Sequence, residues 1–298
     1  MKILSIGNFT TGWDGSICDE EHVASALEFM GHGVIRCQRG EVNTNDGNND
    51  YDFTLVAQWD GYGSLSWLPK PLVYWAFDYQ RDGQEWHERL IEQADLYLSK
   101  RISDSKYPNW QWLSQDFAPT FLDKAPDVEK DIDVLFTGTY LDYSEERNAI
   151  LKAVDDKYNL VIHSVNPEAW QAQGFKNVNG PVMDEQLPGL IARAKINLSV
   201  DAVLERGYWS DRNAQIMACG GFVMYGHVPL SEARFGNKIN YFHNIEECLE
   251  NIEYFLKVDE DREFLAQQGY EYARDNLMVT SRVHDLIVLV SEHLYGKA

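Results

Sequence analysis

Residues 195–226 read "KINLSVDAVLERGYWSDRNAQIMACGGFVMYG", and their pattern predicts a strand, a polar loop, a short helix and a second strand. The apolar run "KINLSV" has the length of a buried strand. Ser210 suits an N-cap, and Ala214 and Met217 give the next segment an apolar helical face. The glycine pair that begins at Gly220 ends this helix before the apolar run "FVMYG". The order predicts a β-α-β unit of a parallel sheet and therefore an α/β fold.

The start of this short helix is a candidate anion site. A helix that follows a strand in an α/β sheet begins at the carboxyl edge, where ligands bind, and its free N–H groups and dipole attract anions. Arg212 falls in the first turn, where the dipole disfavours a cation that lacks an anionic partner. A bound phosphate is one such partner, and an ion pair with Asp211, Glu205 or another carboxylate is the structural alternative. The candidate residues are Ser210, Asp211, Arg212 and Gln215.

The composition is that of a globular protein. The chain has 298 residues, 44% hydrophobic and 24% charged, a length that suits two domains with separate cores. No apolar run is long enough to span a membrane, and the N-terminus lacks the pattern of a signal peptide, so we expect a cytoplasmic protein. With 26 basic and 47 acidic residues, the net charge of -21 opposes sequence-independent binding to nucleic acid. A local basic cleft is compatible with this charge.

The N-terminal part of the chain alternates strands with helices. Residues 2–8 form an apolar run, and residues 20–30 carry apolar side chains at helical spacing up to Gly31. The same patterns predict further strands at 34–38, 52–58, 71–77 and 95–100, and a helix at 83–94. This part therefore reads as one α/β layer.

A linker is predicted at residues 116–131, "DFAPTFLDKAPDVEKD", which combine two prolines with a cluster of charges. We place the domain boundary there, with an N-terminal domain over 1–120 and a C-terminal domain over 121–280. The alternation then restarts, with strands at 132–139, 159–165, 195–200, 222–226 and 239–243 and helices at 144–157 and 184–194. About the last fifty residues are predicted to be helical.

A second glycine site follows the strand at 132–139. Gly138 allows close approach of a ligand, Thr139 can donate to a phosphate or sugar oxygen, and Arg147 lies in the next predicted helix. A glycine that serves only the conformation of the turn is the alternative.

From Ile132 to the C-terminus, the sequence resembles the C-terminal domain of CgeB-like (spore-maturation-type) glycosyltransferases of the GT-B superfamily. The resemblance rests on "DVLFTGT...EER", "LPGLIARAKINLSV", "GYWSDRNAQIMACGGFVMYGHVPL", "NIEECLENIEYFLK" and "TSRVHDLIVLV". Its most specific part is the core S-x-R-x-x-(E/Q)-x-x-A-C-G-G.

The resemblance implies a GT-B fold, in which two Rossmann-like domains with parallel sheets face a central cleft. The C-terminal domain is expected to bind a nucleotide-sugar donor, and a final helix over 281–298 to cross back onto the N-terminal domain. Arg212 matches the arginine that the family places near the donor diphosphate, and Gly138, Thr139 and Arg147 are expected on the donor side. Gln215 replaces the glutamate that commonly holds the ribose, and its amide can both donate and accept hydrogen bonds.

The acceptor side is expected in the N-terminal domain. Its first loop, "NFTTGWDGSICDEEH", resembles the glycine-containing loop of GT-B enzymes that approaches the sugar and the acceptor. Asp78 follows the strand at 71–77, where a carboxylate can take a proton from an acceptor hydroxyl, and a turn or cap aspartate is the alternative. Aromatic faces stack on sugars, although Trp75 and Trp209 suit the core equally well. The acceptor-side candidates are Gly12, Asp14, Gly15, Ser16, Trp59 and Asp60.

The sequence predicts neither a metal site nor a bound cofactor. The eight histidines form no H-x-x-x-H or H-E-x-x-H pair. Metal-independent chemistry fits this pattern, with Arg212, helix dipoles and backbone donors stabilising the leaving diphosphate. The four cysteines lack metal-ligand spacing and are predicted to be buried free thiols.

The resulting hypothesis is a glycosyltransferase that moves a sugar from a nucleoside-diphosphate sugar to a glycan, a protein, a small molecule or modified DNA. Retention of the anomeric configuration is implied by resemblance to related GT-B families. Three alternatives stay open: a nucleotide-sugar epimerase of GT-B fold, a non-catalytic sugar-nucleotide or glycan-binding protein, and a glycosyltransferase acting on modified DNA bases.

Overall fold

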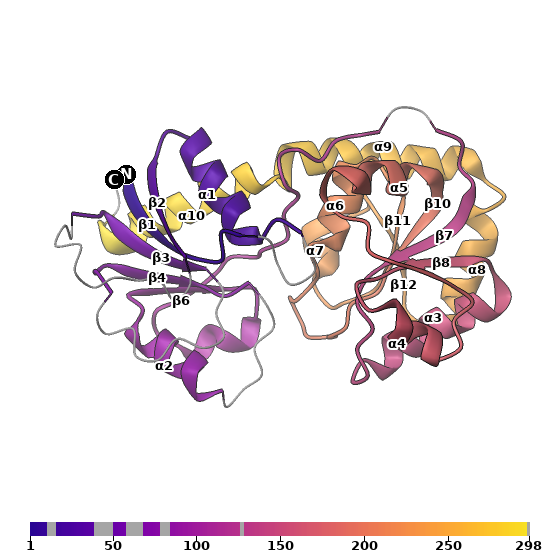
Figure 1. The fold of residues 1–298 in the computed structure, drawn as a ribbon, viewed down its shortest axis with the longest axis horizontal. Coiled ribbons are helices and arrows are strands. Elements are labelled where there is room, and N and C mark those ends of the chain that lie inside the picture. The colour runs from indigo at the N-terminus through magenta and orange to yellow at the C-terminus, as the bar shows by residue number, and fades with distance from the viewer. Residues whose placement is uncertain (11–15, 39–49, 58–67, 78–83, 126–127, 297–298) are drawn as a thin grey trace. The chain divides into compact units, whose positions relative to one another are not determined.

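The computed structural model describes residues 1–10, 16–38, 50–57, 68–77, 84–125 and 128–296. The chain forms two compact units, one of residues 1–115 and 279–298 and the other of residues 116–278. Each unit contains a six-stranded parallel sheet with helices on both faces (Figure 1). The predicted α/β class is therefore confirmed.

The first unit is built on a sheet of strand order β2-β1-β3-β4-β5-β6. Its strands are β1 (Lys2–Gly7), β2 (Gly33–Gln38), β3 (Phe53–Ala57), β4 (Leu72–Trp75), β5 (Leu96–Ser99) and β6 (Trp110–Trp112). Every residue of β3, β4 and β5 is buried, as expected for central strands covered on both faces. The three-residue edge strand β6 was not predicted.

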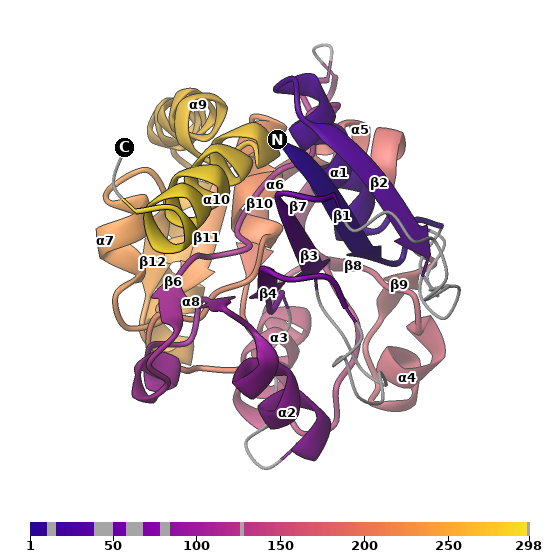
Figure 2. The ribbon, with the colours of Figure 1, turned by 90° about the vertical axis from the view of Figure 1, so that its left-hand side faces the viewer.

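Helices cover both faces of this first sheet. Helix α1 (Asp19–Phe29) packs against α10 (Val279–Leu294) on one face, and α2 (Glu85–Gln93) lies on the other (Figure 2). A 3₁₀ helix η1 spans Ile102–Lys106. The final helix thus completes the first unit although it lies at the far end of the sequence.

The second unit has the strand order β12-β11-β10-β7-β8-β9. Its strands are β7 (Ile132–Thr137), β8 (Leu160–His163), β9 (Asn177–Asn179), β10 (Ala194–Ser199), β11 (Val223–Gly226) and β12 (Asn240–Phe242). After β9 the chain crosses to β10 on the other side of β7, so the strand order reverses between β7 and β10. In open α/β sheets such a switch point is where ligands bind.

Seven α-helices and one 3₁₀ helix belong to the second unit. One face of its sheet is covered by α3 (Glu145–Lys157), α4 (Pro167–Ala172) and α8 (Ile245–Phe255) (Figure 1). The opposite face carries α5 (Leu187–Arg193), α6 (Arg212–Ala218) and α9 (Asp259–Asn276). Helix α7 (Ser231–Phe235) follows β11, and η2 (Asp184–Gln186) precedes α5. The short elements β9, α4 and α7 were not predicted.

The structure tests the prediction that the four cysteines are buried free thiols. Cys219 and Cys248 are buried free thiols, but Cys18 and Cys37 are only partly buried, so the prediction was wrong for these two. Cys37 lies on β2, an edge strand of the first sheet, and Cys18 is the N-cap residue of α1. Within the described ranges, no helix has both the length and the apolar character needed to cross a membrane.

Candidate functional site

Arg212 lies at the switch point of the second sheet. Its Nε donates to the carbonyl oxygen of Thr137, at the end of β7, at 2.8 Å. Its Nη1 donates to the carbonyl oxygen of Val200, just after β10, at 3.4 Å. Because β7 and β10 are neighbouring parallel strands, these two carbonyl groups meet at one edge of the sheet. The guanidinium group therefore spans the position where the strand order reverses.

The helix α6 begins at Arg212, two residues after the predicted cap. The residue before it, Asp211, is in the N-cap position, although its backbone angles are already helical and its side chain makes no cap hydrogen bond. The Ser210 hydroxyl nevertheless accepts a hydrogen bond from the Arg212 backbone N–H at 3.2 Å. The helix ends at Ala218, and Gly220 then adopts a left-handed φ of 73°. Glycine takes this conformation without strain, which explains the stop at Gly220.

A buried carboxylate accompanies Arg212. Asp201 accepts hydrogen bonds from the Tyr225 hydroxyl and from the Ser210 backbone N–H, the latter at 3.3 Å. Burial and the nearby Asp201 carboxylate raise the pKa of Tyr225, so that hydroxyl stays protonated. The Arg212 Nη1 lies 3.9 Å from the Asp201 Oδ1. This ion pair is too long for a hydrogen bond, and the sequence did not single out Asp201 as the partner.

Arg147 carries the second guanidinium of this region, and it is buried, whereas Arg212 is partly exposed. It lies in the first turn of α3, is 3% exposed, and donates from Nη2 to the carbonyl oxygen of Thr139 at 2.8 Å. Among the described residues no acceptor bonds its buried Nε. Burial, and then the positive charge of Arg212, lower the pKa of Arg147 to about 10. The group is charged at neutral pH, and its environment favours an added negative charge.

Gly138 makes room for Arg212. A Cβ atom at this position would lie 3.0 Å from the Arg212 Nη2 and 3.0 Å from the Phe136 ring. The Gly138 backbone N–H donates to the carbonyl oxygen of His163 at 3.0 Å. The glycine thus allows close approach of the arginine side chain, whereas the sequence suggested close approach of a ligand. Thr139 contributes its carbonyl oxygen to Arg147.

Two residues that the sequence did not single out fix this loop. Trp170 Nε1 donates to the carbonyl oxygen of Gly138 at 3.2 Å. The Asn166 amide donates to the carbonyl oxygen of Tyr140 at 3.1 Å and accepts from the Tyr140 backbone N–H at 2.9 Å. Both residues lie far along the chain from the glycine, so no local sequence pattern connects them to it.

Gln215 lies one turn after the start of α6. Its Nε2 donates to the Asp211 Oδ2 at 2.7 Å, and the Ser210 hydroxyl donates to the other oxygen of the same carboxylate at 3.1 Å. The donor-side residues predicted on α6 are therefore joined to one another by hydrogen bonds. All three are partly exposed.

Most predicted acceptor-side residues lie outside the described residues: Gly12, Asp14, Gly15, Trp59, Asp60 and Asp78. Ser16 is described, and it is partly buried shortly before α1. Trp75 and Trp209 are 0% and 3% exposed, so both belong to the core of their units. Neither indole presents a face for stacking on a sugar.

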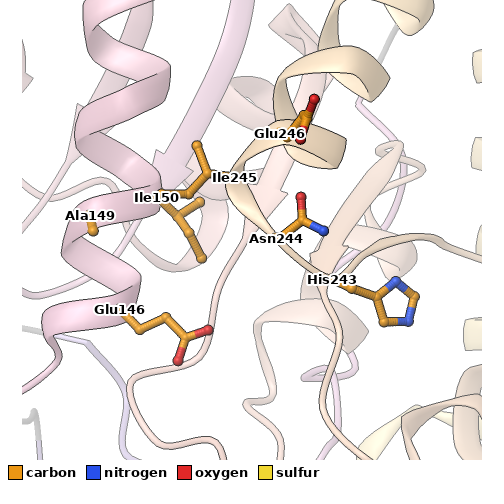
Figure 3. Close-up of a pocket in the computed structure, with 7 residues that line it drawn as sticks. All are labelled: Glu146, Ala149, Ile150, His243, Asn244, Ile245 and Glu246. Atoms are coloured by element: carbon orange, nitrogen blue, oxygen red, sulfur yellow. The ribbon is translucent and has the colours of Figure 1, made fainter.

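A pocket of about 420 Å³ lies between the first turns of α3 and α8 (Figure 3). Ile150 and Ile245 point toward each other across it, and Glu146 also lines it (Figure 3). The remaining lining residues are Ala149, His243, Asn244 and Glu246. None of the residues predicted for the donor site lines this pocket, which is therefore distinct from the arginine pair.

Among the residues whose placement is described, no group of three or more His, Cys, Asp and Glu side chains is arranged to hold a metal ion. The positive charge of the candidate site is supplied by Arg147 and Arg212. Such a pair, fixed by carbonyl groups at a switch point, suits a ligand with two linked phosphates.

Part of the chain matches a known protein family. Residues 146–287 match the family described as "Glycosyl transferase-like". This stretch contains Arg147, α6 and most of the second unit. No curated protein sequence shows a significant match.

Several solved glycosyltransferase structures share the fold. HepE of Anabaena, in complex with UDP-glucose, is 12% identical with a TM-score of 0.69, covering 98% of this chain and 100% of its own. Sucrose-phosphate synthase of Thermosynechococcus elongatus is 10% identical with a TM-score of 0.68, covering 99% and 100%. An alpha-glucosyltransferase in complex with UDP and DNA is 11% identical with a TM-score of 0.71, covering 98% and 100%. The fold is therefore GT-B, and the family match over residues 146–287 supports a glycosyltransferase.

Proposed function

We propose that this protein transfers a sugar from a UDP-sugar to an acceptor hydroxyl, with the donor diphosphate bound by Arg147 and Arg212. The observation that carries this proposal is the pair of guanidinium groups at the switch point of the second sheet, that of Arg147 buried and that of Arg212 partly buried. A diphosphate would add negative charge to that of Asp201, which pairs with Arg212, and it would give the buried Arg147 Nε an acceptor.

The arrangement suits the departure of a nucleoside diphosphate. When the bond between the anomeric carbon and the β-phosphate oxygen breaks, negative charge grows on the leaving diphosphate. Arg212 is already held by two carbonyl groups and by Asp201, so it can stabilise this charge without rearranging. The acceptor oxygen forms the new bond to the sugar, and its proton passes to a base, for which Asp78 stays the prediction.

The choice of uridine rests on the structural neighbours. HepE and a phage T4 glucosyltransferase are described in complex with UDP-glucose, and the alpha-glucosyltransferase in complex with UDP. For the acceptor, the net charge of -21 favours a glycan, a protein or a small molecule over DNA. We therefore expect no general affinity of this protein for duplex DNA at moderate salt.

Within the glycosyltransferases, we propose a CgeB-like enzyme that works without a metal ion and retains the anomeric configuration. The resemblance of the α6 region supports the subtype, and the two arginines support metal independence because they provide the charge that a cation supplies elsewhere. EDTA should leave sugar transfer unchanged. Proton NMR of the freshly formed product should show the anomeric configuration of the donor, and an inverted anomer would refute retention.

A thermal-shift screen tests the donor site. The ligands are UDP, GDP, ADP, CMP and TDP and their sugars, and we expect UDP and a UDP-sugar to raise the melting temperature most. A ligand at about 100 times its Kd stabilises the folded state by about 2.7 kcal/mol. Arg212→Gln should abolish the UDP shift. Arg193→Gln should keep it, because Arg193 is an exposed arginine of the same unit that pairs with Asp131.

Turnover assays separate the alternative functions. Release of UDP that depends on an added acceptor supports transfer. Isomerisation of the donor sugar without an acceptor would establish an epimerase. Binding without transfer or hydrolysis across the donor panel would establish a binding protein. Stabilisation by none of the nucleotides would refute the donor site itself.

A further inference from the structure

Both arginines of the candidate site contact one aromatic ring. The Arg212 guanidinium lies 5.0 Å from the centroid of the Phe136 ring, and the Arg147 guanidinium lies 5.9 Å from it. Phe136 is fully buried near the end of β7, next to the switch point. A cation within about 6 Å of an aromatic ring is attracted by the negative charge of its face.

The Phe136 ring is itself held in place. Trp170 packs edge-on against it, with ring centroids 5.8 Å apart and an angle of 72° between the planes. The indole of Trp170 also lies 5.8 Å from the Arg147 guanidinium and donates its N–H to the carbonyl oxygen of Gly138. Gly138 in turn leaves the space in which Arg212 and Phe136 meet. The ring orientation is thus fixed by its neighbours before any ligand binds.

Two positive groups near each other repel, and in the free protein the Asp201 carboxylate, 3.9 Å from the Arg212 Nη1, offsets only part of that repulsion. The Thr137 and Thr139 carbonyl oxygens each accept one hydrogen bond, from Arg212 and Arg147 respectively. The shared ring adds a second attraction to each cation without neutralising either of them. A further carboxylate at the position of the Phe136 ring would neutralise the remaining charge that an anionic ligand needs. An aromatic ring keeps both charges available.

We propose that Phe136 is a positioning residue that holds Arg147 and Arg212 together and thereby makes the site select a diphosphate over a monophosphate. This inference rests on the proposed function, since it concerns the same donor site. One guanidinium suffices for a single phosphate. Two linked phosphates engage both cations at once, so the preference for the diphosphate depends on the spacing that the ring sets.

The test compares UDP with UMP by isothermal titration calorimetry. We expect Phe136→Leu to reduce the ratio of UDP affinity to UMP affinity about tenfold, because two cation–ring contacts are lost. Phe136→Met removes the ring with a flexible side chain of similar volume, and it serves if the leucine variant does not fold. Both variants should reduce the preference for UDP over UMP.

The matched control is Phe222→Leu. Phe222 is 2% exposed, belongs to the same core as Phe136, and contacts the Phe255 ring with centroids 4.5 Å apart and an angle of 47° between the planes. Its loss should lower stability in a similar way and leave the UDP to UMP ratio unchanged. A purely structural role for Phe136 would make its variants behave like this control.

The outcomes distinguish the two proposals. If wild-type protein binds UDP through Arg212 and both folded Phe136 variants keep the wild-type ratio, the positioning role is refuted and the proposed function stands. If wild-type protein does not bind UDP at all, the proposed donor site is refuted as well.

Discussion

Replacement of Arg147 by methionine should separate stability from ligand binding. The lowering of the Arg147 pKa from 12.5 to about 10 means that its buried charge costs the free protein about 3 kcal/mol. In return, the side chain makes a charge-assisted hydrogen bond to the Thr139 carbonyl, a type of bond that contributes about 1.5–3 kcal/mol. Methionine keeps most of the apolar contact with Phe136 and Trp170. We therefore expect Arg147→Met to change the free energy of unfolding by no more than about 1 kcal/mol.

The effect on the ligand should be much larger. Loss of one charged contact to the diphosphate should weaken UDP binding by about 2 kcal/mol, or roughly 30-fold. Between pH 6 and 9, the pH should not change the difference in stability between Arg147→Met and the wild type. A base with a depressed pKa lowers stability while it is protonated in the folded state, and this penalty is relieved only as the pH rises through the folded pKa of about 10.

Urea denaturation at neutral pH gives the stability, and calorimetry gives the affinity for UDP. Arg262→Met is the matched control, because Arg262 is a buried arginine of α9 that donates to the Phe255 carbonyl at 2.6 Å and pairs with Asp259 at 2.8 Å. The control should destabilise the protein and leave UDP binding intact. A large loss of stability in Arg147→Met together with unchanged UDP affinity would refute the reasoning and make Arg147 a structural residue.

Three further predictions concern separate features. Gly138→Ala should weaken UDP binding at least tenfold in calorimetry, because the added Cβ would displace the Arg212 guanidinium. Gly189→Ala is the control and should leave UDP binding unchanged, because a Cβ at Gly189 meets open space. Gln215→Glu should lower the melting temperature by about 2–4 °C without tightening UDP binding, since the new carboxylate loses the hydrogen bond to Asp211; tighter binding would contradict this. Burial raises the pKa of the Cys219 and Cys248 thiols to about 12, so both should resist alkylation in the native protein at pH 8. Mass spectrometry should find them modified only after the protein is denatured in guanidinium.

Most strands and helices could be predicted from local sequence patterns. The apolar runs at 195–200 and 222–226 are strands β10 and β11, and the helix between them ends at Ala218, just before the glycine pair. The strands and α-helices that were missed are short: β6 and β9 have three residues each, α7 has five and α4 has six. A segment of that length spans too little of a repeat to show a period of 2 or 3.6 residues. Its structure depends on the neighbouring strand or helix.

The candidate site was only partly readable in the same way. Arg212 stood out because a cation is unfavourable in the first turn of a helix, and the structure places it at the switch point. Asp201, Trp170 and Phe136 gave no comparable signal. A buried aspartate, a buried tryptophan and a strand phenylalanine look in sequence like ordinary members of a core.

The sequence by itself determined which segments become strands and helices and where α6 stops, because these follow from side-chain spacing, capping and the backbone freedom of glycine. Only the tertiary structure decided that β7 and β10 are neighbours and that the Thr137 and Val200 carbonyl groups therefore meet at Arg212. It also decided that Arg147 and Arg212 share the ring of Phe136. Such contacts join residues far apart in the chain, and they form because the sheet must bury both of its faces, which no local pattern specifies.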